Sequence, residues 1–278
     1  MLVTGRAFAL DSSSAIAIGP EGGWITALAV SPAFDSDGKL WASAFGGHIF
    51  ASVDAAASWT DSHTGETDPV VEGMAASPNF LADQTVFAAA DEGVFRSTDG
   101  GHTWGLDSAG LGHHFCRAIV VSASFGTDHT MWVATDGGVY RSTDSGSSWT
   151  AATGESRSVI SLAEGAAGTL YAGLDAGGLE ESTDGGDHWQ TVPAFPTSRR
   201  ALGVLPVAGA TASDVLAVTD DGIWSSSDGA LTWRQVGARG DRVDALAESA
   251  PNTSSPRLYA GATAVARGRL FFPRSPTR

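Results

Sequence analysis

An eight-residue motif recurs along the chain at a nearly constant spacing. Three copies begin with Ser-Thr-Asp and end in Trp, at residues 97–104, 142–149 and 182–189, and looser copies occupy residues 52–59 and 226–233. The motif aspartates are Asp54, Asp99, Asp144, Asp184 and Asp228, so successive copies lie 45, 45, 40 and 44 residues apart. A fixed period in this range indicates a repeat architecture.

Each copy is typical of a tight turn between two strands. Ser and Asp side chains bond nearby backbone N–H groups, and Gly relieves strain where the chain bends. A short apolar stretch such as Val94-Phe95 precedes the turn, and the closing Trp supplies a large apolar surface for a neighbouring sheet. We therefore predict structural roles for the five motif aspartates and for Trp59, Trp104, Trp149, Trp189 and Trp233.

The motif resembles the Asp-box, or BNR, repeat of sialidase-like propellers, sortilin-like receptors, xyloglucanases and photosystem II assembly factors. The resemblance covers nearly the whole chain. It implies an all-β fold with a single β-propeller domain. It says little about function, because these families perform unrelated tasks on one scaffold.

The even repeat predicts one domain over residues 1–278, in which residues 265–278 form a loose basic tail. Alignment on the motif predicts four-stranded units, the first with strands at residues 25–31, 40–44, 48–52 and 59–62. The inner strands of the next four units are expected at residues 74–77, 118–122, 159–163 and 201–207.

A ring without free sheet edges would then need a sixth blade. Its strands are expected at residues 243–248 and 257–261, with 6–9 and 15–18 from the other terminus. Residues 264–272 are another source of its third strand, and five blades with ragged ends are the alternative.

Charge and composition limit the class of partner. The net charge is −15, which disfavours nucleic acid and anionic membranes. Cys116 is the one cysteine, so no intramolecular disulfide forms. The first residues lack the apolar core of a signal peptide, and no run has the length of a membrane span. We expect a cytoplasmic monomer, or a secreted one if a signal was removed before residue 1.

Candidate binding residues lie on the face opposite the motif turns, where the resemblance places the functional site. Turns there carry Asp91, Asp136, Asp175 and Asp220 at one repeat position, which is also a hairpin-turn signal. The links between units break the repeat and supply candidate ligand-binding residues: Glu72, His113, His114, Arg117, Arg157, Arg200 and Arg242. Guanidinium groups around a central funnel would suit a carboxylate or phosphate. The alternative is that they pair with neighbouring acids.

Metal and cofactor motifs are weak. His113, His114 and Cys116 include zinc-ligand types, but no second pair at ligand spacing follows. Residues 35–38 resemble the start of a calcium loop without its later ligands, and the matching turns keep only Asp83 and Asp128. We therefore expect no metal and no cofactor, and a turn-forming role for these aspartates.

Two functions remain open. A sialidase would need a free Tyr nucleophile, and Tyr140, Tyr171 and Tyr259 all occupy repeat-defined packing positions. A two-carboxylate glycoside hydrolase could pair Glu72 with Asp241 or Asp244. The alternative that we favour is a non-catalytic binding or scaffold module for a protein partner, a carbohydrate or an anionic ligand.

Overall fold

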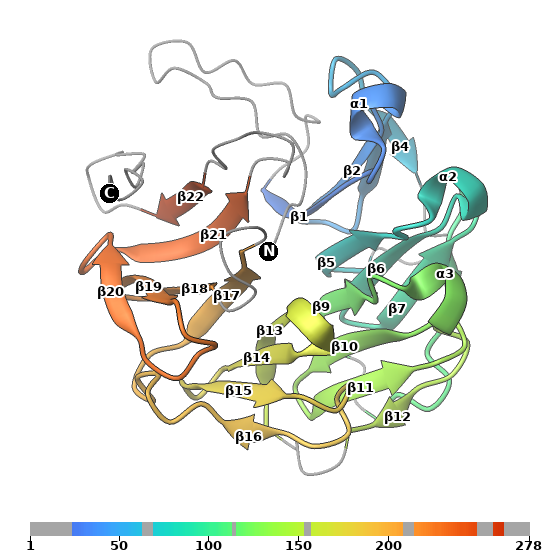
Figure 1. Ribbon diagram of the computed structural model, residues 1–278. Coiled ribbons are helices and arrows are strands. Elements are labelled where there is room, and N and C mark those ends of the chain that lie inside the picture. The colour runs from blue at the N-terminus through green and yellow to red at the C-terminus, as the bar shows by residue number, and fades with distance from the viewer. Residues whose placement is uncertain are drawn as a thin grey trace.

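The computed structural model describes residues 24–62, 69–112, 115–152, 157–207, 214–248 and 258–263, which form small antiparallel sheets arranged around a common axis (Figure 1). From the axis outward, the first sheet contains β1 (Ile25–Val30), β2 (Leu40–Ala44), β3 (Ile49–Ser52) and β4 (Thr60–Ser62). The second contains β5 (Val71–Ala76), β6 (Val86–Ala90), β7 (Gly93–Ser97) and β8 (Gly105–Leu106). The third contains β9 (Cys116–Val121), β10 (Met131–Thr135), β11 (Gly138–Ser142) and β12 (Thr150–Ala151).

The remaining sheets continue the same order around the axis. The fourth contains β13 (Val159–Glu164), β14 (Leu170–Leu174), β15 (Leu179–Ser182) and β16 (Gln190–Thr191). The fifth contains β17 (Ala201–Pro206), β18 (Val215–Thr219), β19 (Gly222–Ser226) and β20 (Arg234–Gly237). A two-stranded sheet follows, formed by β21 (Arg242–Glu248) and β22 (Leu258–Thr263). Each of the inner strands β1, β5, β9, β13, β17 and β21 contacts the next one in the series.

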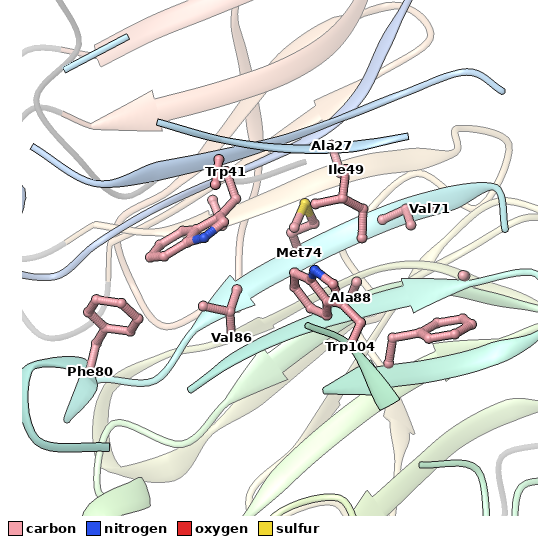
Figure 2. Close-up of a cluster of buried hydrophobic side chains, with 13 residues drawn as sticks. Ala27, Trp41, Ile49, Val71, Met74, Phe80, Val86, Ala88 and Trp104 are labelled. Carbon is pink, nitrogen blue, oxygen red and sulfur yellow. The ribbon is translucent and has the colours of Figure 1, made fainter. Parts of the chain in front are cut away.

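Burial explains why the second strand of each sheet is almost wholly apolar. All five residues of β2, β6, β10, β14 and β18 are buried, because each of these strands lies between two strands of its own sheet and packs against an adjacent sheet. Apolar side chains from adjacent sheets then interlock. Figure 2 shows Trp41 and Ile49 of the first sheet packed near Met74, Val86 and Trp104 of the second.

Side-chain hydrogen bonds hold each motif turn. In the second sheet, Asp99 accepts hydrogen bonds from the Ser97 hydroxyl at 2.7 Å and from the backbone N–H and hydroxyl of Thr103 at 2.9 and 2.6 Å. The Ser97 hydroxyl in turn accepts the backbone N–H of Gly101 at 2.8 Å. The same bonds form around Asp54, Asp144 and Asp228, and around Asp184 with the His188 imidazole in place of the hydroxyl of Thr103.

The predicted first-to-second strand turns are short helices in three sheets: α1 (Phe34–Asp37), α2 (Phe80–Asp83) and α3 (Phe125–Asp128). A 3₁₀ turn (Ala166–Gly168) takes this place in the fourth sheet. The Asp83 carboxylate accepts the Ser77 hydroxyl at 2.6 Å and the Thr85 backbone N–H at 2.9 Å. Asp37 and Asp128 repeat both bonds, so these aspartates close turns as expected.

The all-β class and the propeller-like arrangement are confirmed. The number of blades stays a prediction, because the last described sheet has two strands. The segments expected to complete it, residues 6–9, 15–18 and 264–272, lie outside the described residues. So does residue 257, where the second strand of this sheet was expected to start.

Candidate functional site

Each inner strand contains a one-residue β-bulge near its start. In the second sheet, Val71 pairs with Ala90 and Gly73 pairs with Ala89, so Glu72 has no residue opposite it on β6. The same shift occurs in all the other inner strands. The six extra residues, named here the bulge ring, are Thr26, Glu72, Arg117, Ile160, Leu202 and Asp244. A bulge re-aims a side chain, and bulges are over-represented next to active sites.

The bulge ring surrounds one mouth of a central cavity of about 880 Å³, and all six of its residues line that cavity. Deeper along the inner strands the walls are mostly apolar and include Ala29, Met74, Ile119, Leu162 and Leu205. The mouth opens on the face that carries the second-to-third strand turns and the links between sheets, which we call the rim face. The motif turns lie on the opposite face, because consecutive strands of a sheet run antiparallel.

Arg117 is the centre of the charged part of the mouth. Its guanidinium Nε donates to Asp136 Oδ1 at 2.8 Å, and Nη1 lies 3.5 Å from Glu72 Oε2. The guanidinium also lies over the Phe115 ring, 4.6 Å from its centroid. Arg117 is therefore held between two carboxylates and an aromatic face, and its contact with Glu72 is the longer of the two.

The other predicted arginines also contact carboxylates. Arg242 Nε lies 2.5 Å from Asp244 Oδ1, and Arg200 donates to Asp175. Arg157 is outside the cavity lining and pairs with Glu180, which is buried in the fourth sheet. The pairing with neighbouring acids, which the sequence left as the alternative, is thus the arrangement in this structure.

Two carboxyl groups that line the cavity have raised pKa values. Burial raises the pKa of Glu72, with the opposing charge of Arg117 lowering it and the charges of Asp136 and Asp91 raising it further. Burial also raises the pKa of Glu164, which ends β13 and accepts the backbone N–H of Ala123 at 2.9 Å. Both groups therefore favour the protonated form more than a solvated glutamate does.

The structure sorts the sequence-predicted residues into three groups. Glu72, Arg117, Arg200, Arg242 and Asp244 line the cavity, whereas Asp241 lies in the exposed turn before β21 and does not. His113 and His114 lie outside the described residues. Their proposed roles in binding or catalysis stay predictions.

The sequence reasoning missed several lining residues: Thr26, Phe45, Ile160, Glu164 and Leu202. Glu164 could have been found from the sequence, because it is a charged residue at a position where the other inner strands have apolar residues. Those residues are Val30, Ala76, Val121 and Pro206. Ile160 and Leu202 gave no signal, because an apolar residue in an apolar strand is what the repeat predicts.

Other predicted features can be placed as well. Tyr140 and Tyr171 are buried in the packing positions that the repeat assigned to them. Across the ranges the structure describes, no three His, Cys, Asp or Glu side chains gather in a way that could hold a metal ion. No helix in these same ranges has the length and apolar character needed to cross a membrane.

Comparisons with known proteins support a β-propeller. The family model of the DUF6242 beta propeller domain matches residues 109–214. No curated protein sequence matches the chain.

Solved structures of similar fold belong to proteins of different kinds. The chain superposes on a GH74 xyloglucanase from Xanthomonas campestris with a TM-score of 0.66 and 19% identity, covering 85% of this chain and 44% of that one. For YCF48 bound to a D1 peptide the TM-score is 0.64 at 15% identity, over 86% and 75% of the two chains. For the extracellular domain of a putative one component system from B. thetaiotaomicron, it is 0.63 at 14% identity, over 86% and 31%. The chain thus spans less than half the length of the xyloglucanase, and the likeness at these identities concerns the fold alone.

Proposed function

We propose that this protein is a non-catalytic binding module whose rim face receives a segment of a protein partner at the central mouth. The observation that carries the proposal is the bulge ring. Six side chains of unlike chemistry point from one repeat position into a single cavity with apolar walls. The repeat does not need these side chains for pairing, so their variety is better explained by recognition than by folding.

The state of the charged groups supports binding over catalysis. Arg117, Arg200 and Arg242 each contact a carboxylate, which offsets their attraction for a small anion. The apolar walls below them suit aliphatic or aromatic side chains. YCF48, a propeller of similar fold, has been solved with a bound peptide, which supports the same use of the scaffold here.

A steric plug at the mouth tests this function without assuming a particular ligand. Random dodecapeptides displayed on phage would be panned on the wild-type protein, and the selected clones would be re-tested on I160W and L202W. We expect binding to fall at least about tenfold, because the indole fills the mouth. The control is L81W, at an exposed site on α2 outside the cavity lining. Clones that bind I160W, L202W and wild type equally would refute the proposal, and thermal unfolding would confirm that each variant is folded.

The double variant R117A/R200A then separates ligand classes. An anionic ligand should lose affinity, as the arginine-rich rim predicts, while the matched variant R96A/R141A should not. Arg96 and Arg141 pair with Asp107 and Asp187 at 2.8 and 3.1 Å and are outside the cavity lining.

A glycoside hydrolase is the second candidate. Glu72 and Asp244 line one cavity, and the raised pKa of Glu72 suits a general acid. A panel of aryl glycosides and soluble glucans, assayed with wild type and E72Q, decides between the two. Hydrolysis that disappears in E72Q would establish the enzyme, and its absence across the panel leaves the binding module.

We also propose the finer architecture. The motif turns are Asp-box repeats, and the sheet of β21 and β22 is part of a sixth blade in a single-domain ring. Its inner strand carries the same bulge as the other five, which supports this assignment. The cytoplasmic location and monomeric state expected from the sequence remain predictions.

A further inference from the structure

The first sheet departs from sheets two to five at the mouth of the cavity. In sheets two to five, an aspartate follows the second strand: Asp91, Asp136, Asp175 and Asp220. In the first sheet the matching residue is Phe45. The backbone confirms the match, since Phe45 N–H donates to the carbonyl of Trp24 at 2.8 Å and Asp91 N–H donates to that of Val70 at 3.2 Å.

Three of the four aspartates at this position, all except Asp220, accept hydrogen bonds from other groups at the rim. Asp91 accepts the Val70 backbone N–H at 2.9 Å, Asp136 accepts Arg117, and Asp175 accepts Arg200. Phe45 cannot make such bonds. It is 63% exposed and lines the cavity, so a large apolar ring stands in water where the repeat places a hydrogen-bonded carboxylate. An exposed aromatic of this kind marks an interaction site more often than a structural one.

Trp24 and Ile25 extend this exposed surface. Trp24 is 84% exposed and is joined to Phe45 by the backbone bond just described. Ile25 is 42% exposed, whereas Val71 at the same repeat position is 1% exposed. All three residues are apolar and exposed, and Phe45 lines the cavity; we name them together the aromatic lip.

The neighbours of the aromatic lip on the bulge ring are acidic. β21 and β5 contribute Asp244 and Glu72, and both line the cavity together with Phe45. Asp244 is already paired with Arg242, so Glu72 is the acid that this argument uses. Glu72 is held by Arg117 only at 3.5 Å, while Asp91 and Asp136 add negative charge around it. Electrostatic complementarity therefore favours a cation beside an apolar group at this edge of the mouth.

Building on the proposed binding function, we infer that the aromatic lip docks a peptide segment in which an aromatic or large aliphatic residue is flanked by Lys or Arg. The apolar side chain lies on Trp24 and Phe45 and reaches the apolar wall of the cavity. The cationic neighbour pairs with Glu72. A sugar could also stack on exposed aromatics, but its hydroxyl groups would meet the apolar wall instead of polar partners.

Three blocked heptapeptides test the chemistry: Phe flanked by Lys on each side, Phe flanked by Glu, and Ala flanked by Lys. We expect the Lys-Phe-Lys peptide to bind at least about tenfold more tightly than either of the others, since both the ring and the charges contribute. Equal or tighter binding of the Glu-flanked peptide would overturn the inference. So would binding of cello-oligosaccharides in place of the peptides.

Variants locate the peptide on the surface. F45D restores the residue type of the other sheets, so it should fold normally and lose the preference for Phe over Ala. E72Q should lose the preference for Lys over Glu, and R117A should keep or strengthen binding of the Lys-flanked peptide. L81S, another exposed apolar site, is the control. Peptides that are blocked by I160W but unaffected by F45D would refute the aromatic lip and leave the binding function standing.

Hydroxyl-radical footprinting of the full chain completes the test. Trp24 should be oxidised readily in the free protein and protected when the Lys-Phe-Lys peptide is added. A Trp24 that is already protected in the free chain would mean that residues 1–23 are the occupant of the aromatic lip, and the inference would fail.

Discussion

The indole N–H of Trp41 donates a hydrogen bond of 2.9 Å to the carbonyl oxygen of Gly100, 59 residues further along the chain. Trp41 lies on the second strand of the first sheet, and Gly100 lies in the motif turn of the second. Trp132 makes the same bond to the Gly185 carbonyl at 2.8 Å, between the third and fourth sheets. The motif turn of one sheet is thus fixed to the core of the sheet before it.

Replacing Trp41 with Phe should weaken this connection. The second sheet already has Phe87 at the matching position, so the variant should keep the fold. We expect W41F to lower the free energy of unfolding by about 2–4 kcal/mol, because a buried carbonyl loses its donor and part of an indole is lost from the core. Urea unfolding measures the change. The same stability for W41F and wild type would contradict a structural role for the bond.

Gly101 should not tolerate a side chain. Its φ is +92°, and an added Cβ would lie 2.3 Å from Nε1 of Trp41. Gly46 is the matched control, with φ of +111° and no atom within 4 Å of an added Cβ. We expect G46A to lower the free energy of unfolding by about 1–2 kcal/mol, because alanine is strained in this backbone conformation. G101A should cost clearly more in the same unfolding experiment, and equal losses would show that the contact with Trp41 is easily relieved.

Asp99 should stabilise the protein in a pH-dependent way. Burial is the largest single effect on Asp99 and raises its pKa, but the hydrogen bonds from Thr103, Ser97 and His102 together outweigh it and hold the pKa well below its usual range. A lowered pKa gives stability that is present above the unfolded-state pKa of about 3.9 and is lost as the pH falls toward the folded-state value.

The variant D99A should therefore be less stable at pH 6 by about 1–2 kcal/mol, as for the loss of a capping side chain. The difference from wild type should shrink as the pH falls below about 4. The control D187A removes an exposed ion pair with Arg141 and should change stability by less than about 1 kcal/mol. If the difference in stability between wild type and D99A is unchanged at pH 2, the carboxylate is not its source.

Glu72 should show the opposite pH dependence. Because burial raises its pKa, the folded protein binds this proton more tightly than the unfolded chain does. The resulting stability is complete below the unfolded-state pKa and is lost as the pH rises through the folded-state value. The melting temperature of wild type minus that of E72Q should thus decrease between pH 4 and pH 7. A difference that increases over this range would mean that the ion pair with Arg117 outweighs burial.

Cys116 should be unreactive in the folded protein. Burial raises the pKa of its thiol to about 12, with the charge of Asp136 adding to the effect. The thiolate is the reactive species, so labelling by a disulfide reagent at pH 8 should follow the rate of unfolding. The control is labelling in denaturant, where the reaction should be complete at once. Rapid modification without denaturant would mean that β9 opens locally.

The sequence predicted the sheets better than it predicted the starts of the inner strands. The first inner strand was expected at residues 25–31 and is observed at Ile25–Val30, but the second was expected from Met74 and begins at Val71. The third was expected from Ala118 and begins at Cys116. Glu72 and Arg117 caused both errors, because a polar residue in a bulge interrupts the two-residue alternation by which strands are recognised.

The same physical reason limited the prediction of the site. The arginines and Glu72 could be predicted as site residues because they break the repeat. Phe45 could not, because it resembles any other apolar residue at the end of a strand. Its exposure depends on where β2 ends relative to the cavity, and hydrophobic periodicity does not encode that geometry. A comparison of turn residues between units, position by position, was the signal that could have found it.

The bulge ring has a consequence for how such a molecule can change. Its six positions are spread over the whole chain, yet they meet around one opening and carry none of the cross-strand pairing. Mutational drift, or a saturation library in the laboratory, could therefore rewrite the chemistry of the opening one sheet at a time while the scaffold keeps its shape.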